Sequence, residues 1–554
     1  MVKKKILTFL LSFLLTSINI AQTVQLVPAN DADGKPIVNA LIQYVVADTN
    51  ANGEQLHDIY KLELGKTYFY NQSAVFKNPI TLMADEPGVT NETKPPKIII
   101  TANDEGEVPE EYIIITYANL TLKNIAFSTT SIEGDYSWAN AVLVQKDSLR
   151  IKMENCYFEL IGWGMIEAPV NHTVVIMDRC SVRNGVPYPD GDEWVPFFLE
   201  VDTGTADSIV MRNNTFFNLQ GSVVNIEQQN PVYNFIFDHN TLVNVVKGFT
   251  TAIHAHLNSV ITNNIFYNVS TSGEKIDEIL TDEDHVQNGI INVDTLFSNE
   301  PGASDTLQHI MNEADRKLIV KNNAYFYTQG VKDYWNRFDS VEAVSWMNTR
   351  TKAMFDDDAT WPNFVEENNI EIDPGFTNFG GTHQMVTQLN NHRANGTFGF
   401  WGWDPDSAQY PDVHWAFLQW PLPEDFSYSA NIPTTDGYHA GSLVYYPNEL
   451  AQYIVTGVEK NNKNLHTTFN LKQNYPNPFN PTTNIAFTLA EKGEVSLIIY
   501  NAIGQEVKSI INNKILTAGS YHRIVDMSGF SSGIYFYKLK QNNNIQVQKM
   551  MLLK

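Results

Sequence analysis

The amino-acid sequence predicts an all-β protein: a right-handed parallel β-helix, an irregular aromatic-rich capping region, and a smaller β domain at the C-terminus. Three observations lead to this prediction. A segment with alternating apolar residues recurs between residues 110 and 330. Seven of the ten tryptophans follow it, in residues 331–455. Short β-rich segments bounded by Gly, Asn and Ser close the chain, and heptads and long helical periods are absent.

The first 22 residues have the pattern of a secretory signal peptide. Lys3, Lys4 and Lys5 precede an apolar run over residues 6–15, and small or polar residues follow. The run is too short to span a membrane, and no later apolar stretch approaches 18 residues. We therefore expect export, cleavage near Ala21 or Gln22, and no transmembrane anchor.

Charge and cysteine content narrow the class of protein further. The formal net charge is −25, which repels phosphate backbones and argues against a nucleic-acid partner. Carboxylates bind calcium well, so Ca²⁺ is a possible cofactor, although no residues are assigned to it. Only two cysteines are present, so disulfides do not build the scaffold.

We expect residues 23–110 to form the N-terminal coils of the β-helix, because residues 65–70, 79–83 and 97–101 are short β-rich segments between loops. The copies of the central repeat are residues 120–127, 151–158, 175–182, 209–216, 235–242, 259–266 and 318–325. Alternation of period two is typical of strands, and a repeat of about 25 residues is typical of one turn of a wide coil. The pattern predicts a parallel β-helix over residues 111–330.

Equivalent residues of successive coils are expected to form ladders, because neighbouring strands lie about 4.8 Å apart. Asparagine recurs in two of these ladders, where its side chain can bond the next asparagine and the turn backbone. The two sets are Asn214, Asn240, Asn264 and Asn323, and Asn184, Asn218, Asn244 and Asn268. We interpret both as structural.

Cysteines and charges form two further ladders. Cys156 and Cys180 occupy one repeat position in neighbouring coils, within reach of a disulfide. Side chains in a ladder seldom have the required dihedral, so we expect stacked free thiols. One outward position carries a charge on five coils, and its sign alternates over the last three, Asp178, Arg212 and Asp238. This pattern indicates structural ion pairs and argues against Arg212 as the base of a lyase. The five residues are Lys123, Glu154, Asp178, Arg212 and Asp238.

A second strand of each coil carries the candidate site. Aligning Val144, Ile166, Leu199, Ile226, Ile253 and Ile291 as inward residues gives two outward rows. One row is Gln145, Glu167, Glu200, Glu227, His254 and Asn292; the other is Asp147, Pro169, Asp202, Gln229, His256 and Asp294. The first repeated strand instead has aliphatic outward residues, so we expect residues 331–455 to pack over it. These residues are Ile176, Val210, Ile236, Val260 and Ile319.

The strip of acids and histidines suits carbohydrate chemistry. Glycoside hydrolysis uses two carboxyl groups, one as acid and one as base or nucleophile. Ladder spacing makes Glu200 with Glu227 a retaining pair and Glu167 with Glu227 an inverting pair. Alternatively the carboxylates hold calcium against a uronic acid while His254 or His256 removes a proton. Asp202 and His256 are the outward residues of the strip that we expect to bind substrate. The third interpretation is a solvated acidic face without function, and no intact signature of the common β-helix lyases or glycosidases is present.

The capping region, residues 331–455, is rich in aromatic side chains. Trp401 and Trp403 lie on one side of an extended strand, where they could stack on sugars and bind substrate. More often such rings form the core of a segment with little regular structure, and we favour that interpretation. Residues 456–466 are a polar linker.

The last segment, residues 467–554, contains three motifs in a fixed order. A proline-rich start includes Asn474, Pro476, Pro478 and Phe479. A Tyr-Asn-x-x-Gly-Gln turn contains Gly504, and a Ser-Gly-Ile-Tyr strand contains Gly533. This pattern resembles the type A C-terminal sorting domain of the type IX (Por) secretion system. The resemblance implies a small β-sandwich, the secretion machinery as partner, and a protein released from the cell or attached to its outer surface.

The region upstream resembles pectate-lyase-like exported β-helix proteins, which implies the fold without an assigned activity. Two functions therefore remain open. One is an extracellular hydrolase or lyase that acts on polysaccharide through the strip. The other is a noncatalytic surface protein that binds carbohydrate or mediates adhesion, and the fold alone does not separate them.

Overall fold

The computed structural model describes residues 23–85, 93–109, 112–131, 140–185, 197–201, 203–226, 230–250, 256–271, 289–293, 295–296, 313–337, 344–379, 385–387, 389–390, 420–454, 469–474, 477–489, 493–516, 519–542 and 544–554. The predicted signal peptide, residues 1–22, lies outside these ranges, as does the predicted linker, residues 456–466.

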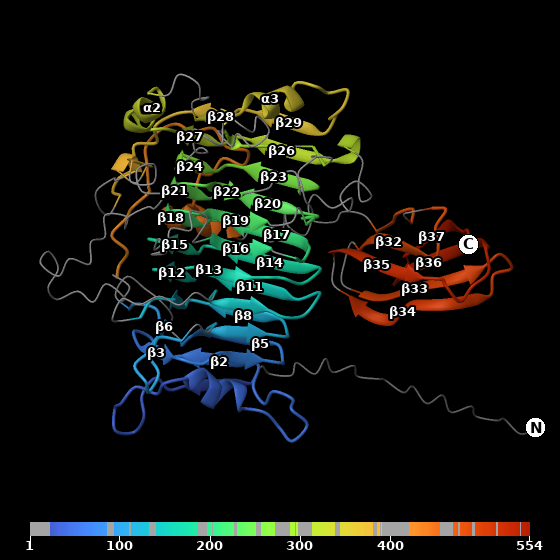
Figure 1. Ribbon diagram of the computed structural model, residues 1–554, viewed down its shortest axis with the longest axis horizontal. Helices are drawn as coiled ribbons and strands as arrows, with labels where there is room; N and C mark the ends of the chain where they lie inside the picture. Colours follow the sequence, from blue (N-terminus) through green and yellow to red (C-terminus); the bar gives the residue numbers. More distant parts are fainter. Residues whose placement is uncertain are drawn as a thin grey trace, which may run out of the picture.

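Three parallel sheets form the walls of a β-helix, and successive coils stack from the N-terminal end upward (Figure 1). The eleven-stranded sheet contains, in spatial order, β1 (Val24–Val27), β2 (Ile59–Leu62), β5 (Ile80–Ala84), β8 (Leu120–Lys123), β11 (Arg150–Glu154), β14 (Thr173–Asp178), β17 (Ala206–Arg212), β20 (Phe235–Asp238), β23 (Asn258–Thr262), β26 (Lys317–Lys321) and β29 (Phe364–Glu367). The predicted parallel β-helix is therefore confirmed.

The other two sheets share the same coil order. The ten-stranded sheet contains β3 (Thr67–Tyr70), β6 (Lys97–Ile100), β9 (Ala126–Ser128), β12 (Tyr157–Glu159), β15 (Ser181–Arg183), β18 (Thr215–Leu219), β21 (Thr241–Val245), β24 (Ile265–Val269), β27 (Ala324–Phe326) and β30 (Ile370–Glu371). The seven-stranded sheet contains β4 (Ala74–Phe76), β7 (Ile114–Thr116), β10 (Val142–Val144), β13 (Gly164–Glu167), β16 (Phe197–Val201), β19 (Ser222–Ile226) and β22 (Gly248–Thr250).

Short elements close both ends of the helix. A π-helical turn, η1 (Ile42–Val46), lies among the first coils. At the C-terminal end are β25 (Gly289–Ile291) paired with β28 (Ser345–Met347), the helices α2 (Gln329–Trp335) and α3 (Thr349–Phe355), and the 3₁₀ turns η5 (Glu313–Asp315) and η6 (Leu443–Tyr445). Trp335 and Trp346 are buried in the main core, as the core interpretation of the capping aromatics predicts.

The C-terminal domain consists of two antiparallel sheets that share one core. The three-stranded sheet contains β31 (Asn470–Leu471), β32 (Thr482–Leu489) and β35 (Gly519–Asp526). The four-stranded sheet contains β34 (Glu506–Leu516), β33 (Gly493–Asn501), β36 (Gly533–Gln541) and β37 (Asn544–Leu552). Ile485 and Phe487 from the first sheet are buried together with Leu497 and Tyr537 from the second, which makes the domain a β-sandwich.

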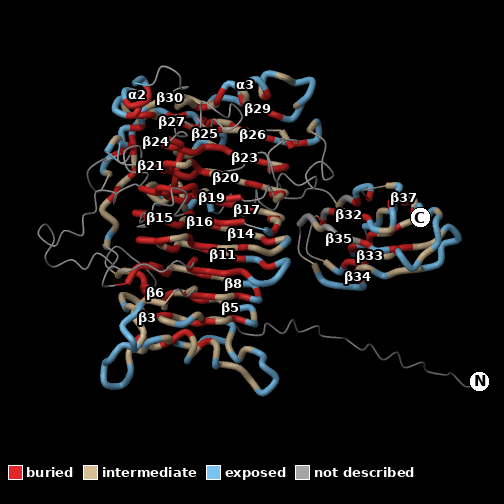
Figure 2. Tube along the Cα trace, viewed as in Figure 1, coloured by how far each residue is buried: buried red, intermediate tan, exposed pale blue. Residues whose placement is uncertain are grey.

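Buried residues run through the stacked coils of the helix (Figure 2), and their apolar side chains form one continuous core. Alternate residues of each strand point inward, and the inward rings stack from coil to coil: Phe216 lies 6.2 Å from Phe237, which lies 6.3 Å from Phe266. Burying each such side chain stabilises the fold by about 1.5–3 kcal/mol. The core is therefore built by repetition rather than by distant tertiary contacts.

Buried asparagine ladders hold the bends between coils, as predicted. The Nδ2 of Asn240 donates to Oδ1 of Asn264 at 3.1 Å, and the Nδ2 of Asn264 donates to Oδ1 of Asn323 at 2.9 Å. Asn264 Oδ1 also accepts the backbone N–H of Asn240 at 2.8 Å. The residue before Asn264, Asn263, has φ 57°, a left-handed conformation that asparagine tolerates. The second ladder is linked in the same way, with Asn268 Nδ2 3.2 Å from Asn244 Oδ1.

The cysteine and charge ladders also follow the predicted register. Both thiols are free and buried, and the backbone N–H of Cys156 donates to Sγ of Cys180 at 3.3 Å. On the eleven-stranded sheet, Glu154 pairs in register with Asp178, and Asp178 with Arg212. Arg212 is thus one member of a structural charge ladder.

The covering segment, residues 420–454, corrects one expectation. It packs mainly on the ten-stranded sheet rather than on the aliphatic outer face of the eleven-stranded sheet, which Tyr453 reaches at Asp238. Phe426 lies 5.2 Å from Phe217, and Glu424 Oε2 lies 3.0 Å from Arg183 Nη2. The repeat alignment did not separate this third sheet, whose outer residues include the larger rings. Ile176 and Ile236, on the other sheet, stay half-buried.

A buried histidine joins the covering segment to the helix. His239 Nδ1 lies 3.2 Å from Asp238 Oδ2, and His239 Nε2 lies 3.6 Å from Asp436 Oδ1. Burial lowers the pKa of His239, but the two carboxylates outweigh it and raise the pKa to about 9. The Tyr453 ring packs on the imidazole, and its hydroxyl donates to Asp238 Oδ2 at 2.8 Å. Arg212 adds positive charge beside Asp238.

We predict that this contact makes the helix domain less stable at alkaline pH. The folded-state pKa is about 9 against an ordinary 6.5, so the stabilisation is full below pH 6.5 and is lost as the pH rises through 9. The loss is on the order of 3 kcal/mol. Urea midpoints measured from pH 6 to 10 should fall in the wild type relative to His239→Gln. The variant is the reference because buried Lys97, whose pKa is lowered to about 8, titrates in both proteins. An equal change in both proteins would contradict the assignment.

We also predict that Asn264→Ala destabilises the helix domain. It leaves the backbone N–H of Asn240 and the carbonyl of Phe237 without their partners, at about 1–3 kcal/mol each. Urea denaturation measures the change. Asn52→Ala, at an exposed loop position, is the control and should shift the midpoint little. Equal shifts would show that the ladder is not a stabilising feature.

Candidate functional site

The seven-stranded sheet places two glutamates on neighbouring strands. Glu167 at the end of β13 pairs in register with Glu200 in β16. Glu200 in turn pairs with Asn225 of β19, and Glu167 with Leu143 of β10. The described row is therefore Leu143, Glu167, Glu200 and Asn225. The adjacency of Glu167 and Glu200 agrees with the predicted row.

The two ends of the predicted row are wrong by two residues. Leu143 stands where the alignment put Gln145, and Asn225 stands where it put Glu227. Apolar residues occur two apart in both strands, and a slip of two leaves every side chain on its own face. Glu227 is therefore not the ladder neighbour of Glu200, and the retaining pair and the inverting pair that include it lose their basis. Glu227 itself lies outside the described residues.

His256 is buried inside the helix, which corrects its assignment as an outward substrate-binding residue. Its exposed fraction is 1%. The ring lies 4.5 Å from the Phe235 ring, and its two nitrogens are each 3.3 Å from a hydroxyl, those of Thr250 and Ser259. Counting by two from Ile253 therefore gives the wrong face for His256. Four other candidates, Asp202, His254, Trp401 and Trp403, lie outside the described residues.

Two residues that sequence reasoning missed hold Glu167. Tyr112 Oη and Asn140 Nδ2 each donate to Glu167 Oε2 at 3.0 Å. Both belong to other coils, and neither occupies the repeat position of a glutamate, so no sequence pattern marks them. Burial raises the pKa of Tyr112, and the neighbouring charges of Glu167 and Glu200 raise it further. Both carboxyl groups thus lie near one un-ionised phenol, and Glu200 is 8% exposed.

Gly164 makes room for this arrangement. A Cβ at Gly164 would lie 2.0 Å from Asn140 Oδ1 and 2.9 Å from the Phe197 ring. Asn140 is itself buried, and its Oδ1 has no hydrogen-bond partner among the described residues. The glycine therefore fixes the distance between Asn140 and the strand that carries Glu167.

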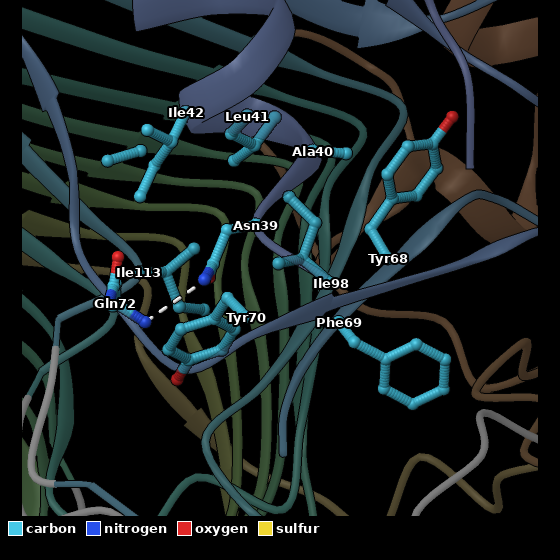
Figure 3. Close-up of a pocket in the computed structure, with 11 residues that line it drawn as sticks. Asn39, Ala40, Leu41, Ile42, Tyr68, Phe69, Tyr70, Gln72, Ile98 and Ile113 are labelled. Atoms are coloured by element: carbon cyan, nitrogen blue, oxygen red, sulfur yellow. Dashed lines mark hydrogen bonds between the residues drawn. The ribbon is translucent and has the colours of Figure 1, made fainter. Parts of the chain in front are cut away.

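Two further features were candidates for ligand binding: clusters of metal-binding side chains, and a cavity near the N-terminal end of the helix. Within the described part of the chain, no group of three His, Cys, Asp or Glu residues could hold a metal ion, so the calcium prediction gains no residues. A small cavity under η1 has room for about 10 Å³ between Leu41, Tyr70 and Ile98 (Figure 3). That is about the space of one water molecule. Its polar edge is closed by Gln72, whose backbone N–H donates to Asn39 Oδ1 at 3.2 Å.

The motif residues of the C-terminal domain are structural parts of the sandwich. The Asn474 backbone N–H donates to Tyr537 Oη at 2.6 Å, and Asn474 Nδ2 donates to Thr483 Oγ1 at 2.9 Å. Phe479 is buried and bridges to Leu552. These contacts tie the proline-rich start to both sheets.

The remaining motif residues lie at bends of the same domain. Gly504 has φ 82° in the turn that follows Asn501, where a side chain would be strained. Gly533 begins β36, and Pro478 follows a cis peptide bond. Pro476 lies outside the described residues.

Residues 473–553 match the family model of the secretion system C-terminal sorting domain. The chain is therefore exported by the type IX system to the cell surface or beyond it, and the sorting domain is recognised by that machinery. A comparison with curated proteins finds no match for the chain. Among the described residues, no helix has the length and apolar character that crossing a membrane requires.

We predict that Gly164→Ala displaces the residues that pack against the strand of Glu167. Because the new methyl group meets both Asn140 and Phe197, we expect a loss of about 1–3 kcal/mol in the free energy of unfolding. Urea denaturation of the helix domain measures it. Gly529→Ala is a matched control, since a Cβ at Gly529 would have no other atom within 4 Å. An unchanged midpoint in Gly164→Ala would contradict the tight contact.

Proposed function

We propose that this exported protein acts on polysaccharide at the cell surface, as a glycoside hydrolase that uses Glu167 and Glu200. The observation that carries the proposal is the register of β13 and β16, which makes these two glutamates ladder neighbours. Most glycoside hydrolases use a pair of carboxyl groups that lie close together. Export to the outside brings the protein to extracellular polymers.

The spacing favours a retaining mechanism. Neighbouring parallel strands lie about 4.8 Å apart, and the carboxyl groups of retaining enzymes lie about 5–5.5 Å apart. Inverting enzymes need about 6.5–9.5 Å to admit a water molecule between the groups. Adjacent ladder positions therefore fit a covalent route better than direct attack by water.

Glu167 is the better nucleophile of the pair. An ionised carboxylate only accepts hydrogen bonds, and both contacts to its Oε2 come from donors, Tyr112 and Asn140. In the proposed reaction, Glu167 attacks the anomeric carbon, the glycosidic C–O bond breaks, and Glu200 gives its proton to the leaving oxygen. Glu200 then takes a proton from water, whose oxygen displaces Glu167 from the sugar. Tyr112 and Asn140 are positioning residues.

The described residues support hydrolysis better than elimination. Of the two predicted lyase bases, His256 is buried against Phe235 and cannot reach an outside polymer. The noncatalytic alternative, a surface protein that only binds carbohydrate, is separated from hydrolysis by experiment.

We predict that the wild type releases reducing ends from at least one member of a panel of neutral and acidic polysaccharides. Glu167→Gln and Glu200→Gln should each lower the rate by about 10²- to 10⁴-fold. Glu105→Gln, at an exposed loop carboxylate, should leave it unchanged. All proteins are assayed with and without calcium, and ultraviolet absorbance detects the unsaturated products of a lyase.

Three results would overturn parts of this proposal. Full activity in Glu200→Gln would show that the proposed site is wrong. Unsaturated products would show that the reaction is elimination and not hydrolysis. Binding without turnover across the panel would favour the noncatalytic alternative.

A further inference from the structure

A second hollow lies at the C-terminal end of the helix, far along the coil stack from Glu167 and Glu200. It has room for about 300 Å³, a volume typical of small ligand sites. Its lining residues belong to β27, α2, β28 and β30 or directly adjoin these elements. Figure 1 shows α2, β27 and β28 at the upper end of the helix, and Figure 2 shows β30 there. The lining residues that carry the argument are Tyr325, Lys332, Asn336, Trp346 and Glu371. We call it the terminal cleft.

An aromatic wall forms one side of the terminal cleft. The Tyr325 and Trp346 rings are stacked, with centroids 4.9 Å apart and planes 14° apart. Trp346 is buried, and its indole N–H donates to Glu366 Oε1 at 2.8 Å, which fixes the ring from behind. Tyr325 is half-buried and lines the open space. Burial and the charges of Glu371 and Glu366 raise the pKa of this tyrosine, which keeps its hydroxyl a donor.

The terminal cleft is also lined by a polar and nearly neutral group of side chains. Lys332 of α2 is paired with Glu371 of β30. Their side chains are 39% and 46% exposed, so both ends of the pair also face water. Asn336, one turn beyond Lys332, is exposed and adds an amide. Donors and acceptors therefore lie beside an aromatic ring, since Glu371 is the ladder neighbour of Tyr325.

We propose that the terminal cleft binds one neutral sugar residue of a polysaccharide. An aromatic face beside convergent hydrogen-bonding groups matches a pyranose, which is apolar on one face and carries hydroxyls around its edge. The mutual pairing of Lys332 and Glu371 leaves no uncompensated cation for a uronic acid or a phosphate. Vicinal hydroxyls can donate to the carboxylate and accept from the ammonium group.

This inference deepens the proposed function, since it gives the polymer a second contact several coils beyond the carboxylate pair. The coils between β16 and β27 separate the two sites along the helix axis. A sugar held in the terminal cleft would therefore belong to the same chain at a distance from the bond that is cut, and would not touch Glu167 or Glu200.

Binding is measured apart from turnover, with the full chain carrying Glu200→Gln as the parent. The probes are cello-, manno- and xylo-hexaose as neutral oligosaccharides and hexagalacturonate as the acidic one, followed by calorimetry and tryptophan fluorescence. We expect at least one neutral probe to bind. Lys332→Met and Glu371→Gln should each raise its Kd by about tenfold or more, a difference of about 1.4 kcal/mol. Hexagalacturonate should bind more weakly.

The chain offers a matched control on neighbouring strands. Lys321 and Glu367 form the same kind of ion pair, 2.6 Å apart, on the eleven-stranded sheet. Lys321→Met and Glu367→Gln should leave the Kd unchanged. These charge variants keep the test valid even if Tyr325→Ala, which removes part of the aromatic wall, fails to fold.

Two results would overturn the terminal cleft as a sugar site: equal effects of both ion-pair sets on the Kd, or binding of hexagalacturonate alone. Failure of the proposed function looks different. Absence of turnover, together with neutral-sugar binding that depends on Lys332 and Glu371, would contradict the proposed hydrolase function and support the terminal cleft as a sugar site. Turnover of short substrates that Lys332→Met leaves unchanged, without any measurable neutral-sugar binding, would support the hydrolase function and contradict the terminal cleft as a sugar site.

Discussion

Parallel backbone pairing between successive coils fixes the position of every side chain in the helix domain. Each coil lies one strand spacing above the last, so a residue's neighbours are set by register rather than by distance along the chain. The asparagine ladders reinforce this constraint at the bends. In the ladder that contains Asn240 and Asn264, one side-chain oxygen accepts from both the side chain and the backbone N–H of the neighbouring asparagine, and in the other ladder the side chains bond one another. The pairing of Glu167 with Glu200 is one consequence of that register. The buried joint at His239 is another, since it depends on which coil presents Asp238 to the covering segment.

The sequence alone predicts those features that depend on the period and on residue type at a bend. The asparagine ladders, the stacked thiols of Cys156 and Cys180, and the alternating charges at Asp178 and Arg212 all follow from aligning the repeats. The sorting domain is recognisable because its motif residues hold the sandwich together, as the contacts of Asn474 with Tyr537 and Thr483 illustrate.

Other features could not be predicted, for identifiable physical reasons. A strand with apolar residues two apart is equally consistent with two registers, which is why Asn225 replaces Glu227 in the row. Tyr112 reaches Glu167 across 55 residues of sequence and has no place in the repeat. The burial of His256 against the Phe235 ring does not follow from a count of alternate residues. The position of the covering segment depends on a third sheet that the repeat alignment does not separate.

Export and fold define where the protein works, and the carboxylate pair defines what we propose it does there. The most direct test of the pair is to trap the covalent intermediate with a set of 2-deoxy-2-fluoro glycosides and locate the attached sugar by peptide mass spectrometry. The account predicts one sugar bound to the peptide that contains Glu167, and none in Glu167→Gln. A sugar attached to another residue, or turnover that inverts the anomeric configuration, would contradict it.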